Sequence, residues 1–214
     1  MSSWRSQRRI RDISQTLRPG LPVWPGDTQF AFERTWKMED GSPVNVGRMT
    51  MSTHSGTHGD APLHYHPQAP DIASVELDPY IGECLVVDVT GVTGDRVRVG
   101  DLPHIESADR VLFRTFASFP HDEWESGFTA IAAETIEWLA AQGVKLIGTD
   151  APSVDLQESK TMDAHKAVLA NDMRILEGLV LDGVPEGRYE LIALPIKVAG
   201  GDAGLCRAIL RDLE

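Results

Sequence analysis

The segment from residue 53 to residue 64, THSGTHGDAPLH, holds the densest group of metal-binding side chains in the chain. It contains His54, His58, Asp60 and His64, four potential ligands within eleven residues. Imidazole nitrogens and carboxylate oxygens are the ligands that zinc and similar divalent ions take up in proteins. Packing alone does not account for so many of them in a segment broken by glycine and proline. The segment therefore predicts a metal-dependent hydrolase.

The spacing of His54 and His58 predicts a bend between them. In an extended strand the two residues would lie roughly 13 Å apart, too far for two ligands of one ion. A helical turn, or a tight loop at Gly56, brings them to about 6 Å. Asp60 then completes a set of three ligands, and three protein ligands with an open position are typical of catalytic zinc. Two ordinary loop histidines are the alternative.

A second, weaker group of ligands lies downstream at His165 and Glu177. On one straight helix these residues would be about 120° apart around the axis, so a shared site needs a break, which we expect near residues 171–172. Taken alone, each residue is more typical of a solvated surface. If Asp60 and Glu177 each bridge two ions, they suffice for a two-ion centre together with His54, His58 and His165. Such a centre holds the nucleophile of a hydrolytic reaction.

The sequence leaves the roles of four other residues near these segments open. His64 is either functional or an ordinary loop residue, and His66 lies so close to it that spacing does not show which of the two acts. Trp24 is either a turn tryptophan packed on the core or an aromatic wall for a flat substrate. Ser55 is a weak candidate nucleophile, because no Gly-x-Ser-x-Gly motif is present. No phosphate-binding glycine loop is present either.

Length, charge and cysteine content limit the class of protein. A chain of 214 residues can form one domain with a sizeable core. Its formal net charge of −12 argues against nucleic acid and anionic membranes as partners. No apolar run is long enough to span a bilayer, and the basic N-terminus is not followed by the apolar stretch of a secretory signal. With only Cys84 and Cys206, no disulfide framework is expected, which suits a cytoplasmic protein.

The hydrophobic pattern predicts a strand-rich, mixed α/β single domain over residues 1–214. Four arginines interrupt the pattern over residues 1–12, which we expect to form an N-terminal arm. Residues 129–142 read as a helix that is capped by Thr129 and ends at Gly143. Residues 18–27 are expected to form a loop. Strands are predicted at residues 12–14, 45–51, 84–89, 110–114, 144–150 and 188–195, and residues 208–213 are expected at a sheet edge.

The chain resembles the cyclase family of metal-dependent amide hydrolases. The signature of that family, His-x-Gly-Thr-His-x-Asp-x-Pro-x-His, is matched at every fixed position by residues 54–64. Within the family, the chain is most similar to the bacterial kynurenine formamidases (arylformamidases). This similarity extends over nearly the whole length, and it is carried by residues 12–14, 24–27, 148–154, 164–165, 175–179 and 189–195.

The resemblance implies a swivelling β/β/α fold, a homodimer and two zinc ions per subunit, with manganese as an alternative. It implies hydrolysis of N-formyl-L-kynurenine to L-kynurenine and formate in tryptophan degradation. His64 falls at the position of the proton donor and acceptor, and Trp24 at that of an aromatic residue that contacts substrate, from its own or the partner subunit. The implied metal ligands are His54, His58 and Asp60 for one ion and His165 for the other, with Asp60 and Glu177 bridging.

One departure from the family pattern concerns the substrate. Leu205 and Cys206 stand where we expect Pro-Val or a similar pair, near the expected rim of the pocket, so the departure bears on the substrate and not on the metal. A relative that opens a cyclic amide such as isatin, with one manganese ion, is the alternative hydrolase. A non-catalytic metal-binding or ligand-binding module is the alternative from another class, and it would have no need of His64 as a proton donor. A purely structural metal would instead leave the chain unfolded after chelation.

Overall fold

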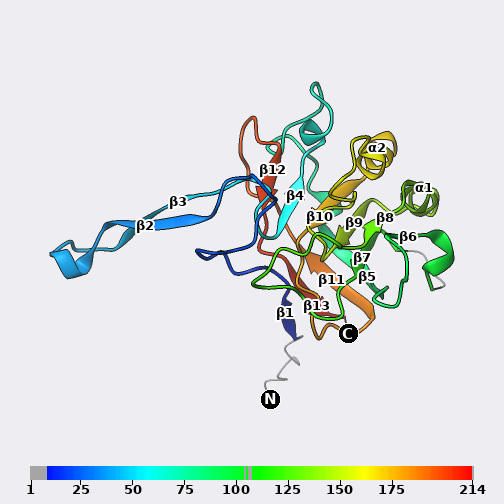
Figure 1. Ribbon diagram of the computed structural model, residues 1–214, viewed down its shortest axis with the longest axis horizontal. Coiled ribbons are helices and arrows are strands. Elements are labelled where there is room, and N and C mark those ends of the chain that lie inside the picture. Colours follow the sequence, from blue (N-terminus) through cyan, green and yellow to red (C-terminus); the bar gives the residue numbers. More distant parts are fainter. Residues whose placement is uncertain (1–8, 104, 106–107, 214) are drawn as a thin grey trace, which may run out of the picture.

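The computed structural model describes residues 9–103, 105 and 108–213, and it is built around a nine-stranded sheet (Figure 1). The strand order is β1-β13-β11-β5-β7-β9-β10-β4-β12. The strands of this sheet are β1 (Ile10–Asp12), β4 (His58–Asp60), β5 (Ile81–Asp88), β7 (Arg110–Arg114), β9 (Leu146–Thr149), β10 (Arg174–Glu177), β11 (Gly187–Ile192), β12 (Ala203–Leu205) and β13 (Ile209–Asp212). The two-stranded pairs are β2 (Ala31–Trp36) with β3 (Val46–Thr50) and β6 (Arg96–Val97) with β8 (Ala130–Ile131).

The helices are few and short. Two are α-helices, α1 (Ala133–Ala141) and α2 (Asp163–Ala170), and both lie on the same side of the sheet (Figure 1). The described residues also form 3₁₀ turns at Met38–Asp40, Pro62–His64, Asp78–Tyr80 and Val99–Asp101. The prediction of a strand-rich, mixed α/β fold is therefore confirmed. No helix in the described part of the chain is long and apolar enough to cross a membrane.

The middle of the sheet is buried on both faces. Strands β5, β7, β9 and β10 run parallel to one another, and successive residues of each strand point into different hydrophobic clusters. Val111 and Ile147 pack with the side chains of α1 and α2, whereas Leu112 and Leu146 pack with residues of β11 and β13. This arrangement explains why these strands read as continuous apolar runs in the sequence.

The predicted strands at residues 84–89, 110–114, 144–150 and 188–195 correspond to β5, β7, β9 and β11. The predicted capping of the helix by Thr129 is wrong, because α1 begins at Ala133 and its N-cap is Ala132. Residues 130–131 instead extend as β8 beside β6, and this pairing delays the start of the helix. The helix end is as predicted, with Gly143 at a φ of 91°.

The two chain ends form neighbouring strands. Residues 1–8 of the expected arm lie outside the described residues, but the prediction is wrong for Ile10–Asp12, which pair with β13 as an edge strand. Consequently β13 lies between β1 and β11 and is not at the edge expected for residues 208–213. The strand expected at 12–14 ends at Asp12.

Strands β2 and β3 form a hairpin that projects away from the sheet (Figure 1). Every residue of both strands is exposed. The strand predicted at residues 45–51 is therefore present as β3, but its partner lies in a segment for which no strand was expected. The hairpin leaves the body of the protein after the loop at residues 18–27 and returns directly before His54.

Candidate metal centre and active site

The first ligand group is formed by a tight turn that leads into β4. Gly56 has a φ of 71°, and the turn brings His54 Nδ1 within 3.2 Å of His58 Nε2. The bend predicted from the spacing is thus present. The same two nitrogens lie 3.2 and 3.4 Å from Oδ1 of Asp60. These three residues offer ligand atoms that all lie within 4.8 Å of one another.

The second group reaches the same place from α2 and β10. Helix α2 ends at Ala170, before residues 171–172 where a break was predicted, and Asp172 has a φ of 50°. His165 Nε2 then lies 3.4 Å from Oδ2 of Asp60 and 3.8 Å from Oε1 of Glu177. The chain therefore brings together two segments more than 100 residues apart.

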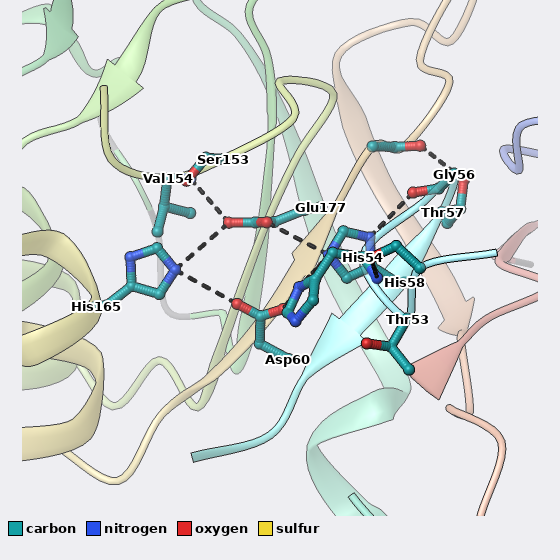
Figure 2. A network of polar contacts seen from close by, with 12 residues as sticks. Thr53, His54, Gly56, Thr57, His58, Asp60, Ser153, Val154, His165 and Glu177 are labelled. Atoms are coloured by element: carbon teal, nitrogen blue, oxygen red, sulfur yellow. Dashed lines mark hydrogen bonds and ion pairs between the residues drawn. The ribbon is translucent and has the colours of Figure 1, made fainter. Parts of the chain in front are cut away.

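Both carboxylates lie between the two groups of histidines (Figure 2). Asp60 directs Oδ1 to the first group and Oδ2 to His165. Glu177 directs Oε2 to His58, at 3.5 Å, and Oε1 to His165. Their position follows from the sheet, because β4 and β10 pair with Glu177 directly opposite His58. Each carboxylate can therefore bridge two cations.

The orphaned oxygens of Asp60 show that the site fits divalent cations. The residue is fully buried, and neither Oδ1 nor Oδ2 has a hydrogen-bond partner among the described residues. Glu177 is also buried, at 4 % exposure. Burying such charges without compensation is costly, and bound metal ions are one of the usual solutions. His54, His58, Asp60, His165 and Glu177 are the residues that would hold them.

The pKa values of the clustered residues also indicate a site that binds cations. Desolvation alone would lower the pKa of His58 and of His165, but the carboxylates that face them raise both pKa values to about 10. Against the opposing effect of burial, the three histidines hold the pKa of Asp60 well below its usual range. The carboxylates thus favour the protonated forms of the imidazoles that face them. Cation binding must displace those protons.

Hydrogen-bond partners outside the ligand set orient two of the histidines. His58 Nδ1 lies 3.0 Å from the carbonyl oxygen of Gly56, which leaves Nε2 free for a metal. His165 Nδ1 lies 2.7 Å from Asp155. Such partners fix the ring orientation and raise the basicity of the ligand. The third histidine, His54, has Asp202 3.6 Å from its Nε2, which is beyond hydrogen-bond distance. Sequence reasoning missed both aspartates, because no local spacing connects them with the histidines.

Replacement of Asp155 by asparagine is expected to weaken metal binding by about 10- to 100-fold. Asp155 now accepts hydrogen bonds from the backbone N–H of Ala164 through Oδ1 and from that of His165 through Oδ2. Asparagine keeps an acceptor for one of these two donors, and it loses the charge that holds the His165 ring. Competition with a chromogenic chelator measures the change in affinity. Asp163→Asn is the matched control, since Asp163 lies exposed in the first turn of the same helix. Equal affinities for the two variants would contradict the role of Asp155.

A contact between two glycines holds the two ligand segments together. Gly178, directly after Glu177, has a φ of 62°, and a Cβ atom there would lie 2.6 Å from the carbonyl oxygen of Gly56. The carbonyl of Gly178 accepts hydrogen bonds from Thr57 Oγ1 at 2.6 Å and from Gln15 Nε2 at 2.9 Å. The main chains of the two segments therefore approach each other more closely than side chains would allow.

His64 lies on the open side of the cluster. It is carried by a 3₁₀ turn that begins at Pro62, and its ring centroid lies 4.0 Å from that of His54 and 5.7 Å from that of His165. Desolvation, together with the neighbouring imidazoles, lowers its pKa although nearby carboxylates oppose the shift. A nitrogen of His64 also lies within 4.8 Å of ligand atoms of Asp60 and His165. His66 is exposed and is not part of the cavity wall.

A cavity of about 330 Å³ opens beside the cluster. Trp24 forms part of its wall, packed edge-on against Trp124 with 5.5 Å between ring centroids. Trp124, which was not singled out from the sequence, donates a hydrogen bond from Nε1 to Gln157 at 2.7 Å. The rest of the wall includes His54, His58, His64, His165, Glu177, Leu156 and Met162. The cavity therefore joins the metal cluster to an aromatic surface.

The expectation that Leu205 and Cys206 lie at the rim of this cavity is wrong. Leu205 ends β12, and Cys206 follows it. Leu205 and Cys206 line a separate cavity with Leu17 and Ile196, and neither is among the residues that line the cavity beside the cluster. The departure from the expected Pro-Val pair thus does not alter the wall beside the metal centre.

Comparison with known proteins identifies the family. The sequence profile of the family described as "Putative cyclase" matches residues 11–156. The chain belongs to the cyclase family. Curated relatives of the chain carry the name kynurenine formamidase. One, from Erythrobacter litoralis, is 79% identical over 100% of this chain and 98% of its own, and another, from Maricaulis maris, is 58% identical over 96% and 99%.

Solved structures of the cyclase family share this fold. A protein described as a potential metal-dependent hydrolase with cyclase activity superposes with a TM-score of 0.83 at 32% identity, over 96% of this chain and 98% of its own. An isatin hydrolase bound to the product analogue thioisatinate gives a TM-score of 0.82 at 20% identity, over 97% and 94%. The second similarity shows the fold alone. This chain is therefore a hydrolase of the cyclase family with a cluster suited to metal binding.

Proposed function

We propose that this chain hydrolyses N-formyl-L-kynurenine to L-kynurenine and formate, a step of tryptophan degradation. The observation that carries the proposal is the 79% identity, over the whole chain, to a relative named kynurenine formamidase. The site supports it, because five convergent ligands adjoin a cavity with an aromatic wall. We propose two zinc ions, with manganese as the alternative, held by His54, His58, Asp60, His165 and Glu177.

The chemistry divides between the ions and the side chains. When bound, divalent ions supply Lewis acidity and lower the pKa of water to about 7. His64 stands on the open side of the cluster, at the cavity wall, where it can give a proton to the aromatic amine as this group leaves. Trp24 offers a flat surface to the ring of the substrate. The tryptophans and apolar residues around them reduce the access of water to that ring.

Replacement of Trp24 by alanine is expected to raise KM by roughly 2- to 10-fold with a smaller effect on kcat, because a lost aromatic contact removes about 0.5–1.5 kcal/mol of binding. Steady-state kinetics with N-formyl-L-kynurenine measure both constants. Trp24→Phe keeps an aromatic surface and should retain most of the affinity. An unchanged KM in the alanine variant would assign Trp24 to core packing with Trp124 and Phe128.

The direct test of the proposed function is turnover by metal-free protein before and after addition of zinc or manganese. N-formyl-L-kynurenine and isatin are assayed in parallel, with the bound metal counted by elemental analysis. We expect hydrolysis of the formamide that depends on two ions per chain. Preferred opening of isatin would support the cyclic-amide alternative. Metal binding without turnover of either compound would support a non-catalytic module, and unfolding after chelation would support a structural metal.

We also propose a homodimer in which the β2–β3 hairpin contacts a second copy of the chain. Two-stranded hairpins are marginally stable in water by themselves. Large apolar side chains nevertheless cover this one: Phe32 is 49% exposed, Trp36 58% and Met49 54%, and Phe32 lies opposite Met49 in the register. Contiguous exposed apolar surface of this kind marks interaction sites.

The molar mass in solution, measured by size-exclusion chromatography with light scattering, tests the dimer. The wild-type chain should elute with twice the mass of the monomer, and the double variant Phe32→Ser/Trp36→Ser should shift towards the monomer. Ile10→Ser/Leu213→Ser removes comparable exposed side chains far from the hairpin and should leave the mass unchanged. A monomeric wild-type protein would overturn the proposal. One domain over residues 1–214 and a cytoplasmic location remain predictions from the sequence.

A further inference from the structure

The cavity beside the metal centre has a carboxylate in its wall that lies outside the group of histidines. Of the carboxylates in its wall, Glu177 faces the histidines, whereas Asp27 stands apart from them. In the described part of the chain, no lysine or arginine lines this cavity and no ion pair to Asp27 is present. Asp27 is exposed at the wall. A substrate therefore meets one carboxylate whose charge is not neutralised.

The local backbone holds Asp27 beside the aromatic wall. Its N–H donates to the carbonyl oxygen of Trp24 at 2.9 Å, in a turn that Gly26 closes with a φ of 89°. The N–H of Thr28 donates to Oδ1 of Asp27 at 2.6 Å. Oδ2 is then free to accept a hydrogen bond from a ligand. The turn thus places Asp27 three residues after Trp24, and both residues line the same cavity.

The surroundings add to this negative potential. A smaller cavity shares Gln15, Pro22 and Trp124 with the first and is lined by Glu123 and Glu125. The arginine of the preceding loop, Arg18, is already paired with Asp122. A concave surface lined by one sign of charge raises the local concentration of ligands of the opposite sign. The mouth of the site therefore favours a cationic group on the substrate.

We infer that Asp27 binds the α-ammonium group of the substrate and makes the site selective for amino-acid formanilides. The inference rests on the proposed function, because N-formylkynurenine carries this ammonium group on the chain next to its formamide. With the ring of the substrate on Trp24, a charge-assisted hydrogen bond to Asp27 fixes the amino-acid end. No lysine or arginine of the described wall is available to pair with the carboxylate of the substrate.

The test combines two substrates with one variant. The substrates are N-formyl-L-kynurenine and 4-(2-formamidophenyl)-4-oxobutanoate, which lacks only the amino group. For the wild-type enzyme, loss of the amino group should lower kcat/KM by about tenfold, as expected for a charge-assisted contact that is partly exposed. In Asp27→Asn, which keeps the acceptor for Thr28, the two substrates should be hydrolysed with similar efficiency. The change should appear mainly in KM.

Glu123→Gln is the matched control, since it removes the same charge from the adjoining cavity. It should preserve the preference for the amino-acid substrate. If it abolishes the preference as Asp27→Asn does, the general potential and not a direct contact selects the substrate, and the inference is overturned. It is also overturned if Asp27→Asn affects both substrates alike or neither. Failure of the wild-type enzyme on both formanilides would instead refute the proposed function.

Discussion

Replacement of His64 by alanine should lower kcat by about 10²- to 10⁴-fold while the protein keeps its metal. The expected loss is large because the leaving group is an aromatic amine that needs a proton, and His64 is placed at the open side of the cluster to give it. Metal content should be preserved, because the convergent histidines and carboxylates are untouched. Elemental analysis and steady-state kinetics on the same preparation measure both quantities.

The control for this variant is His66→Ala. His66 is two residues away, exposed, and engaged through Nδ1 by the N–H of Gln68 at 3.3 Å. The His66→Ala variant should retain normal turnover. This result would show which of the two histidines, His64 or His66, donates the proton. Normal turnover of His64→Ala would reassign the proton to His66 or to water. Loss of metal from His64→Ala would make His64 a ligand, as its distance to Asp60 and His165 also allows.

Replacement of Asp60 by asparagine should remove most of the bound metal and, with it, detectable hydrolysis. Asp60 faces His54 and His58 with one oxygen and His165 with the other, so its charge serves both positions at once. An amide offers one neutral oxygen and cannot bridge in the same way. Elemental analysis after dialysis measures the loss, and circular dichroism establishes that the variant is folded.

Asp150→Asn is a control for burial alone. Asp150 is buried to a similar degree, and it accepts hydrogen bonds from Thr115 and Phe116 instead of facing the cluster. Burial raises its pKa to about 6, although these hydrogen bonds oppose the shift. Its variant should retain the metal. Full metal content in Asp60→Asn would exclude Asp60 from the ligand set.

Local signals in the sequence predicted the parts of the site that local geometry controls. Gly56 between two histidines indicated the bend, and the polar residues near 171–172 indicated the break that separates His165 from Glu177. The central strands were predicted because both of their faces are buried, which makes their sequences apolar throughout. The convergence of the two ligand segments was inferred from the chemistry of the residues and from the family resemblance.

Features set by distant partners could not be predicted in this way. Asp155 orients His165 and Asp202 lies beside His54, but neither aspartate shares a sequence pattern with its histidine. The hairpin strand β2 has no buried face, so it lacks the alternation that would reveal it. The expected cap at Thr129 was displaced because the pairing of β8 with β6 keeps the chain extended up to the helix.

The contact between Gly56 and Gly178 limits how this site could be transferred to another protein. The eleven-residue signature supplies three of the five proposed ligands, and Glu177 is placed by main-chain atoms that meet across the two glycines. Grafting the signature onto a new scaffold would therefore reproduce a metal-binding turn without a second bridging carboxylate. A designer would have to transplant both backbones in register, with glycine retained at both positions, before the side chains could converge.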